Sequence, residues 1–201
     1  MAESPTVLLI LAGPAGVGKS TLCDRLVREV PGFERVITAT TRPPRPNEVD
    51  GRDYHFLTEE EFDARLAAGD FLEWAWVHRK YRYGTPKSTV LERLNHTCLV
   101  MNIDVQGVRS IRAAAETTPE LKGHLVTMFV SPDSMDVLRE RLLGRGPVSE
   151  EELARRLQSA EFEMADRSSY DFVIHSKTKE QDFRALLEFW EQAKRKLGHG
   201  C

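Results

Sequence analysis

Apolar residues follow two patterns along this chain, short continuous runs and longer segments where they recur every three or four positions. The first pattern is typical of strands buried on both faces, and the second of amphipathic helices. Their alternation predicts an α/β fold with a parallel sheet covered by helices on both faces. The expected strands are 6–11, 33–38, 71–77, 98–103, 124–130 and 171–175.

Capping residues mark where the helices begin. A side-chain oxygen at the N-cap satisfies a backbone N–H that the first turn leaves unpaired. The predicted caps are Thr58 with Glu61, Ser131 followed by Pro132, Ser149 with Glu152, and Thr178 with Gln181. The predicted helices are 21–29, 58–69, 88–94, 105–115, 132–144, 153–167 and one that begins near 178, whereas 79–86 reads as a turn.

Two segments interrupt the alternation of strands and helices. Residues 38–87 are short strands and turns rich in Arg and Tyr, and residues 141–156 are a helix-turn-helix with an arginine cluster. We interpret them as an inserted lobe and a small helical lid, on a core formed by 1–37, 88–140 and 157–201. Because ligands of such sheets bind beyond the carboxyl ends of the strands, both insertions are expected to flank the site.

Composition restricts the classes of partner. The net charge of −3 over 201 residues excludes a general binder of nucleic acid, so any anion site is local. No apolar stretch is long enough to span a bilayer, and no basic leader precedes the first apolar run. Cys23, Cys98 and Cys201 form no C-x-x-C pair, and nothing in their spacing calls for a disulfide. We therefore expect a cytoplasmic protein without a membrane partner.

Residues 13–20 read GPAGVGKS and fit the phosphate-loop pattern G-x-x-x-x-G-K-[ST] between a predicted strand and a predicted helix. Glycines let consecutive N–H groups surround an anion, and the helix N-terminus adds positive potential. Lys19 can reach the terminal phosphates, and the Ser20 hydroxyl is placed to ligate Mg²⁺. The expected ATP-binding residues here are Gly13, Pro14, Ala15, Gly16, Val17, Gly18, Lys19, Ser20 and Thr21.

The inserted lobe contains residues suited to a second phosphate. Arg42 and Arg45 lie three apart in a proline-stiffened loop, and guanidinium forks match phosphate oxygens in a bidentate way. Tyr54 and Tyr83 can each donate a hydroxyl hydrogen bond to the same anion. Taken singly, the arginines can equally be a solvated pair and the tyrosines ordinary half-buried aromatics. Together, beside a phosphate loop, they indicate a second anionic substrate.

Glu73 lies inside the apolar aromatic run FLEWAW, where a carboxylate needs partners unless it faces solvent on an edge strand. A guanine offers it two donors, N1–H and the 2-amino group, whereas adenine would leave it unpaired. Such a polar mismatch discriminates more strongly than apolar shape. Thr38 and Thr85 can donate to the guanine O6. This set predicts a guanine nucleotide as the second substrate.

The motifs together resemble guanylate kinase over about residues 6–197. Behind GPAGVGKS come TTRPPR, DGRDYHF, GDFLEWA, YGTP, NIDVQGV and RLLGRG with EEELARRL, in that order. The resemblance implies transfer of the terminal phosphate of ATP to GMP with Mg²⁺, giving ADP and GDP for purine nucleotide metabolism. It implies ATP and GMP as partners and leaves the use of dGMP open, with no evident protein partner.

The resemblance also assigns roles to residues. It implies that Arg42, Arg45, Tyr54 and Tyr83 bind the GMP phosphate and that Thr38, Glu73 and Thr85 read the guanine, with Gly84 and Asp104 also at the GMP site. Arg145 and Arg156 match lid arginines that reach the transferred phosphate, and Arg141 joins them at the edge of the ATP site. The expected catalytic residues are Lys19, Arg42, Arg145 and Arg156.

Asn102 departs from the family pattern. Where the family usually has D-x-D, this chain has Asn102-Ile103-Asp104. Asn102 keeps one acceptor oxygen but loses the charge that helps to hold Mg²⁺ and phosphate. We expect Asn102 and Ser20 at the metal, with weaker metal organisation and retained activity.

Two other functions fit parts of the pattern. A guanylate-kinase-like scaffold module would use the fold to grip phosphorylated peptides, but such modules typically have a damaged phosphate loop, whereas Gly18, Lys19 and Ser20 are intact. A kinase for another phosphorylated substrate, such as a sugar phosphate, would have no use for Glu73 as a guanine reader. Both alternatives make different predictions for an assay with ATP and GMP.

Overall fold

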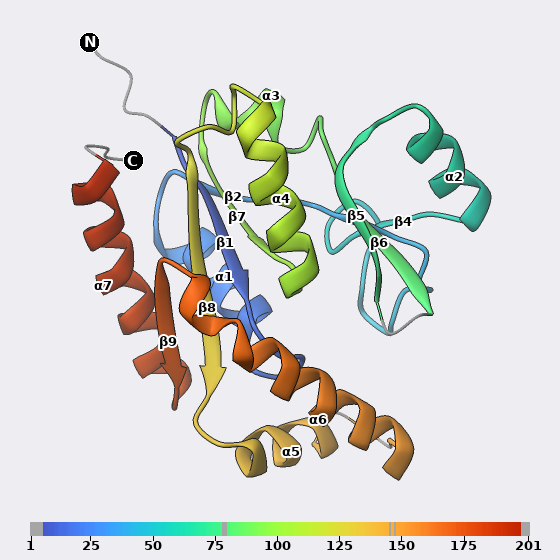
Figure 1. Cartoon of the computed structure of the whole chain (residues 1–201), viewed down its shortest axis with the longest axis vertical. Helices are drawn as coiled ribbons and strands as arrows, with labels where there is room; N and C mark the ends of the chain where they lie inside the picture. Colours follow the sequence, from blue (N-terminus) through green and yellow to red (C-terminus); the bar gives the residue numbers. More distant parts are fainter. Residues whose placement is uncertain (1–5, 78–79, 145, 147, 198–201) are drawn as a thin grey trace.

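A parallel five-stranded sheet forms the centre of the computed structural model, which describes residues 6–77, 80–144, 146 and 148–197 (Figure 1). The strand order is β2-β7-β1-β8-β9, and every neighbouring pair in it is parallel. The predicted α/β fold is therefore confirmed. Its strands are β1 (Leu8–Ala12), β2 (Phe33–Arg35), β7 (Cys98–Asn102), β8 (Leu125–Pro132) and β9 (Phe172–Ser176).

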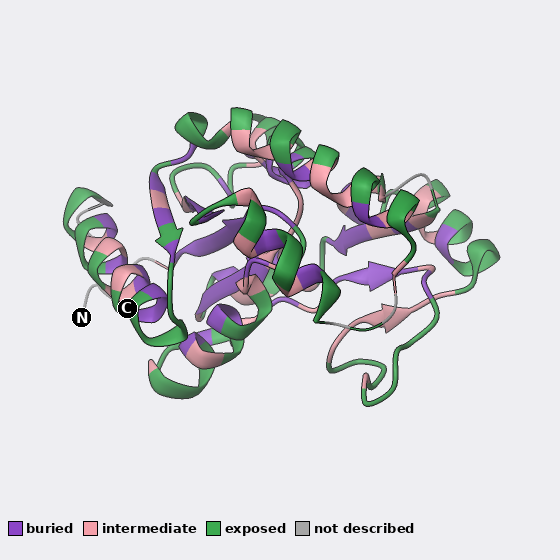
Figure 2. Ribbon diagram, turned by 90° about the horizontal axis from the view of Figure 1, so that it is seen from below, coloured by how far each residue is buried: buried purple, intermediate pink, exposed green. Residues whose placement is uncertain are grey.

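Helices cover both faces of this sheet because side chains alternate along each strand. On one face, Leu9 packs in a cluster with Leu26 of α1 and Trp190 of α7. On the other face, Leu8 packs in a cluster with Ile111 of α4. Figure 2 shows the result, with buried strands inside and the outer faces of the helices exposed. The helices are α1 (Lys19–Glu29), α2 (Glu59–Ala67), α3 (Leu91–Leu94), α4 (Val105–Thr117), α5 (Met135–Leu143), α6 (Glu150–Ala165) and α7 (Lys179–Leu197), with a 3₁₀ turn η1 (Arg167–Ser169).

A second, four-stranded sheet in the order β4-β3-β6-β5 lies beside the first and on its own side of the molecule (Figure 1). Its strands β3 (Ala39–Thr40), β4 (His55–Phe56), β5 (Phe71–Val77) and β6 (Tyr81–Pro86) all come from the segment interpreted as an inserted lobe. The prediction of a turn at 79–86 is wrong, because most of it is strand β6. Antiparallel pairing with β5, for example between Trp76 and Arg82, provides hydrogen-bond partners for the backbone of this segment, although it contains Gly and Pro.

The start of α5 also differs from its prediction. Ser131 and Pro132 belong to β8, because their parallel pairing with β9 continues to the end of that strand. The N-cap of α5 is instead Ser134, whose hydroxyl accepts from the Val137 N–H at 3.2 Å. The caps predicted at Thr58 and Ser149 are confirmed, and Thr58 with Glu61 forms the complete reciprocal pair.

The cysteines differ from expectation at one position. Cys23 in α1 is a free thiol in the core, but Cys98 at the start of β7 is disulfide-bonded, which the spacing did not predict. Within the described residues, none of the helices has both the length and the apolar character needed to cross a bilayer.

Candidate active site

A cleft of about 1380 Å³ runs from the phosphate loop to the second sheet. Its walls come from the loop after β1, the inserted lobe, the turn between β7 and α4, and one face of α6. It collects most of the residues that the sequence singled out. The predicted residues in its wall are Gly13, Ala15, Gly16, Gly18, Lys19, Ser20, Thr21, Thr38, Arg42, Arg45, Tyr54, Glu73, Tyr83, Gly84, Asn102, Asp104 and Arg156.

Four predicted residues lie off the wall, and one falls outside the described chain. Pro14, Val17 and Thr85 are close neighbours of wall residues but do not line the cleft. Arg141 donates from Nη1 to the Ser176 hydroxyl at 3.0 Å and from Nη2 to the Lys177 carbonyl at 3.0 Å, so it joins α5 to the end of β9. Arg145 lies outside the described residues.

The phosphate loop has the close backbone approach that its glycines predict. A Cβ on Gly13 would lie 2.3 Å from the Val130 carbonyl oxygen, so no larger residue fits there. Gly18 has φ +111° and caps α1 without a side-chain hydrogen bond, which leaves the first N–H groups of the helix available to an anion. Lys19 Nζ donates to the Gly13 and Pro14 carbonyl oxygens and so lies over the loop.

In the inserted lobe, Arg42 is held by several partners at once. Its Nε donates to the Tyr83 hydroxyl oxygen at 3.0 Å, and its Nη2 donates to both carboxylate oxygens of Glu48 at 2.9 Å. Its guanidinium carbon lies 5.5 Å from the centre of the Tyr54 ring. Burial raises the pKa of Tyr54, so its phenol remains a hydrogen-bond donor at neutral pH. The sequence analysis did not single out Glu48.

Glu73 lies at the other end of the lobe and is largely buried. Thr85, its partner in the β5–β6 register, donates its hydroxyl to Glu73 Oε1 at 2.6 Å. Gly107 of α4 approaches the second oxygen so closely that a Cβ there would lie 3.4 Å from Oε2. Burial raises the pKa of Glu73 to about 7, with the Thr85 hydrogen bond opposing the shift and Asp104 adding to it.

The end of β7 and the facing part of α6 form the floor near the phosphate loop. Asn102 Oδ1 accepts from Arg35 Nη2 at 3.3 Å, and Asp104 caps α4 by accepting from the Gly107 N–H at 2.8 Å. Across from them, Glu163 Oε2 is buried with no hydrogen-bond partner in the described structure. Burial raises the pKa of Glu163 to about 7, an effect opposed by Lys19 and reinforced by Asp104.

Sequence reasoning missed Glu163, although a signal was available. Arg156 and Glu163 are seven residues apart on α6, a spacing that puts both on one helix face. Arg156 Nε donates to Glu152 Oε1 at 2.8 Å, and all three side chains line the cleft. This face of α6 therefore carries both signs of charge toward the phosphate loop.

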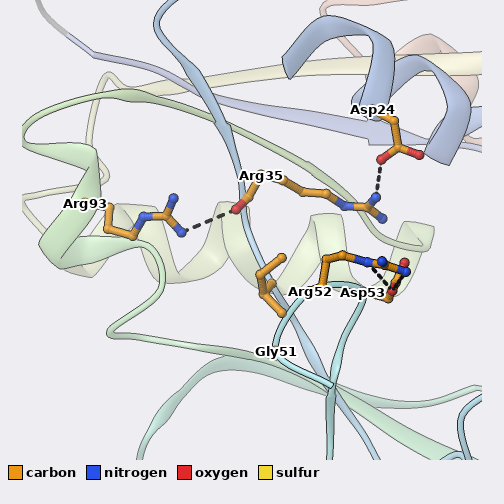
Figure 3. Close-up of a pocket in the computed structure, with 7 residues that line it drawn as sticks. Asp24, Arg35, Gly51, Arg52, Asp53 and Arg93 are labelled. Carbon is orange, nitrogen blue, oxygen red and sulfur yellow. Dashed lines mark hydrogen bonds and ion pairs between the residues drawn. The ribbon is translucent and has the colours of Figure 1, made fainter. Parts of the chain in front are cut away.

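A second pocket, of about 590 Å³, lies between α1, β2 and the loop before β4 (Figure 3). Its guanidinium groups already have partners: Arg35 pairs with Asp24, Arg52 with Asp53, and Arg93 donates to the Arg35 carbonyl oxygen at 3.3 Å. No predicted site residue lines this pocket. The larger cleft beside the phosphate loop is therefore the candidate active site.

A family model described as guanylate kinase matches residues 6–193 of this chain. The chain belongs to the guanylate kinase family. A guanylate kinase of Symbiobacterium thermophilum is 43% identical over 169 residues, covering 84% of this chain and 76% of its own. One of Bifidobacterium longum is 41% identical over 192 residues, covering 95% of each. Like these guanylate kinases, the chain is an ATP:GMP phosphotransferase.

Solved structures agree with this membership. The crystal structure of a guanylate kinase from Anaplasma phagocytophilum has a TM-score of 0.74 and 25% identity, and covers 97% of this chain and 94% of its own. A shikimate kinase from Bacteroides thetaiotaomicron has a TM-score of 0.52 at 17% identity over 94% of this chain and 98% of its own, which shows the fold alone.

The raised pKa of Glu73 predicts how GMP use depends on pH. The ionised carboxylate, which can accept from guanine, prevails only above about pH 7 in the free protein. We expect kcat/KM for GMP to fall as pH is lowered through about 7. Glu73→Gln should lower kcat/KM at every pH and weaken this step to what Glu163 contributes, since burial raises the pKa of Glu163 to about 7 as well, and it should leave the KM for ATP unchanged. The same pH step in Glu73→Gln would contradict the assignment.

The same shift predicts an effect on stability. Because the folded state binds the Glu73 proton more tightly than the unfolded chain, this group makes the wild type less stable as pH rises from about 4.5 to about 7. In Glu73→Gln the side chain does not ionise, so the variant does not lose stability in this way. Urea unfolding should show that the variant gains stability relative to the wild type between pH 5 and pH 8. If the difference in unfolding free energy between the variant and the wild type were the same at pH 5 and pH 8, burial would not raise this pKa.

Proposed function

We propose that ATP binds on the phosphate loop, that GMP binds against the second sheet, and that their phosphates meet between Lys19 and Arg42. The observation that carries this proposal is that an anion cradle and a buried carboxylate paired with Thr85 open into one cleft. Phosphoryl transfer requires alignment and charge neutralisation more than an acid or a base, which such a cleft supplies.

For the acceptor, we assign the phosphate of GMP to Arg42, Arg45, Tyr54 and Tyr83, which line the same part of the cleft. Glu73 accepts from the guanine edge, and Thr38 donates to O6. Thr85 gives its hydroxyl hydrogen to Glu73, so its contribution is to orient that carboxylate. This geometry supports the base-reading role because a neighbouring donor and a close helix both restrict the Glu73 side chain.

For the donor, Lys19 and the N-terminus of α1 neutralise the phosphates of ATP, and Arg156 approaches from α6. Arg145 keeps the role that the resemblance implies. We also propose that residues 38–87 and 141–156 move as a lobe and a lid on the core, and that their closure excludes water from the transfer. We further propose that the enzyme acts on purine nucleotides in the cytoplasm.

The donor groups at the phosphate end fit a Mg²⁺ that arrives with ATP. Mg²⁺ in kinase sites is typically held by one or two protein side chains together with the phosphates of the nucleotide. The residues that would hold it are Ser20 and Asn102, and the unpartnered Glu163 oxygen gives the acidic character that such a site needs. When bound, Mg²⁺ neutralises charge on the phosphates.

A coupled assay of ADP formation tests the function. We expect turnover with GMP and dGMP, and little with AMP, UMP or ribose phosphates, since only a guanine satisfies Glu73. Lys19→Ala should lower kcat about 100-fold or more, because it removes charge stabilisation at the transferred phosphate. Lys122→Ala, on the exposed surface, is the matched control. Equal use of AMP, or near-native kcat in Lys19→Ala, would contradict the proposal.

Asn102 gives a second prediction. Its oxygen faces Arg35 and carries no charge, so it organises a cation weakly. Asn102→Asp should lower the Mg²⁺ concentration needed for half-maximal activity, and Asn95→Asp, on the surface, should not. Unchanged turnover and Mg²⁺ dependence in Asn102→Asp would show that the acid is dispensable here.

A further inference from the structure

Glu48, in the loop between β3 and β4, joins both arginines assigned to the acceptor phosphate. Both of its carboxylate oxygens accept from Arg42 Nη2 at 2.9 Å, and one also accepts from the Arg45 backbone N–H at 2.7 Å. Its own backbone N–H donates to the Arg45 carbonyl at 3.0 Å, which closes a turn. A single side chain thus fixes one guanidinium and the backbone from which the other extends.

The direction of this contact decides what Glu48 can do. Arg42, Arg45, Tyr54 and Tyr83 line the cleft, whereas Glu48 does not. The carboxylate therefore holds Nη2 of Arg42 from outside the set of residues that line the cleft. Nε of Arg42 donates to the Tyr83 hydroxyl and Nη1 to the Pro43 carbonyl. With Nη2 bound to Glu48, each of the three guanidinium nitrogens has a partner that restricts its orientation.

The pair is shielded enough for its geometry to matter. The side chains of Arg42 and Glu48 are only 9% and 17% exposed, unlike the solvated pairs that contribute little. Loss of the carboxylate would leave a buried guanidinium with an unpaired Nη2 group. The turn is also constrained by Asn47, which at φ 73° has a left-handed backbone found at no other non-glycine residue of the described chain.

We propose that Glu48 is a positioning residue for the acceptor phosphate, holding Arg42 and the Arg45 turn ready to receive it. This inference rests on the proposed placement of GMP. Preorganisation raises affinity because the side chains lose less freedom when the phosphate binds. The negative charge of Glu48 acts in the opposite direction, since it weakens the attraction of Arg42 for a phosphate. The two effects predict opposite outcomes when that charge is removed.

The experiment compares GMP with guanosine, which lacks the phosphate, in calorimetric titrations of the full chain. For Glu48→Gln we expect GMP affinity to fall about tenfold or more, with guanosine affinity and the KM for ATP unchanged. Glu48→Asp, which keeps the charge, should recover part of the loss. Glu60→Gln, an exposed residue of α2 with the same change in charge, is the control and should behave as wild type.

Three results would overturn the proposal. Unchanged GMP affinity in Glu48→Gln would mean that Arg42 is positioned without the carboxylate. Tighter GMP binding would mean that charge competition outweighs preorganisation. An equal loss for GMP and guanosine would mean that Glu48 merely supports the fold of the lobe. The wild type tests the proposed placement of the GMP phosphate separately. Equal affinities of the wild type for GMP and guanosine would mean that the protein has no site for this phosphate.

Discussion

Coulomb repulsion between two phosphate groups is the constraint on which this structure depends. A protein of net charge −3 must concentrate cations at one place and keep them oriented there. Two arginines of the cleft wall are paired with acids of the same lobe or helix. Arg42 pairs with Glu48 in the inserted loop, and Arg156 pairs with Glu152 one turn earlier on α6. These ion pairs restrict both guanidinium groups in the wall of the cleft.

Buried acids form the second electrostatic feature of the cleft. Burial raises the pKa values of Glu73 and Glu163 to about 7, and Asp104 adds to both shifts. Asp104 lies at the N-terminus of α4, where its charge acts on both Glu73 and Glu163. Ionisation of these groups near neutral pH gives the cleft a charge that changes over the physiological range. The Thr85 hydroxyl opposes the rise in the pKa of Glu73, and Lys19 opposes that of Glu163.

Local patterns predicted the core and the phosphate loop because both depend on residues adjacent in sequence. Strand β1 is a continuous apolar run, and Gly13 to Ser20 is a contiguous motif. Strand β6 was missed because its backbone is satisfied by β5, which no local pattern reveals. The cap at Ser134 was misplaced because pairing with β9 extends β8 past the expected end.

In the candidate site too, local sequence indicates some residues, and only the tertiary structure reveals others. Residue chemistry and the resemblance indicated Glu73, Arg42 and Thr85, whereas the structure adds Glu48 as the partner of Arg42 and the hydrogen bond from Thr85 to Glu73. Glu163 was missed although its spacing from Arg156 puts both on one face of α6, and its buried, unpaired oxygen is a tertiary property that the sequence does not reveal.

A crystal structure with ADP and GMP bound together would test the central claim most directly. We expect the guanine N1–H and 2-amino group within hydrogen-bond distance of the Glu73 carboxylate, and the GMP phosphate between Arg42 and Arg45, facing the terminal phosphate of ADP. A purine ring remote from Glu73, or a GMP phosphate bound elsewhere, would contradict the account.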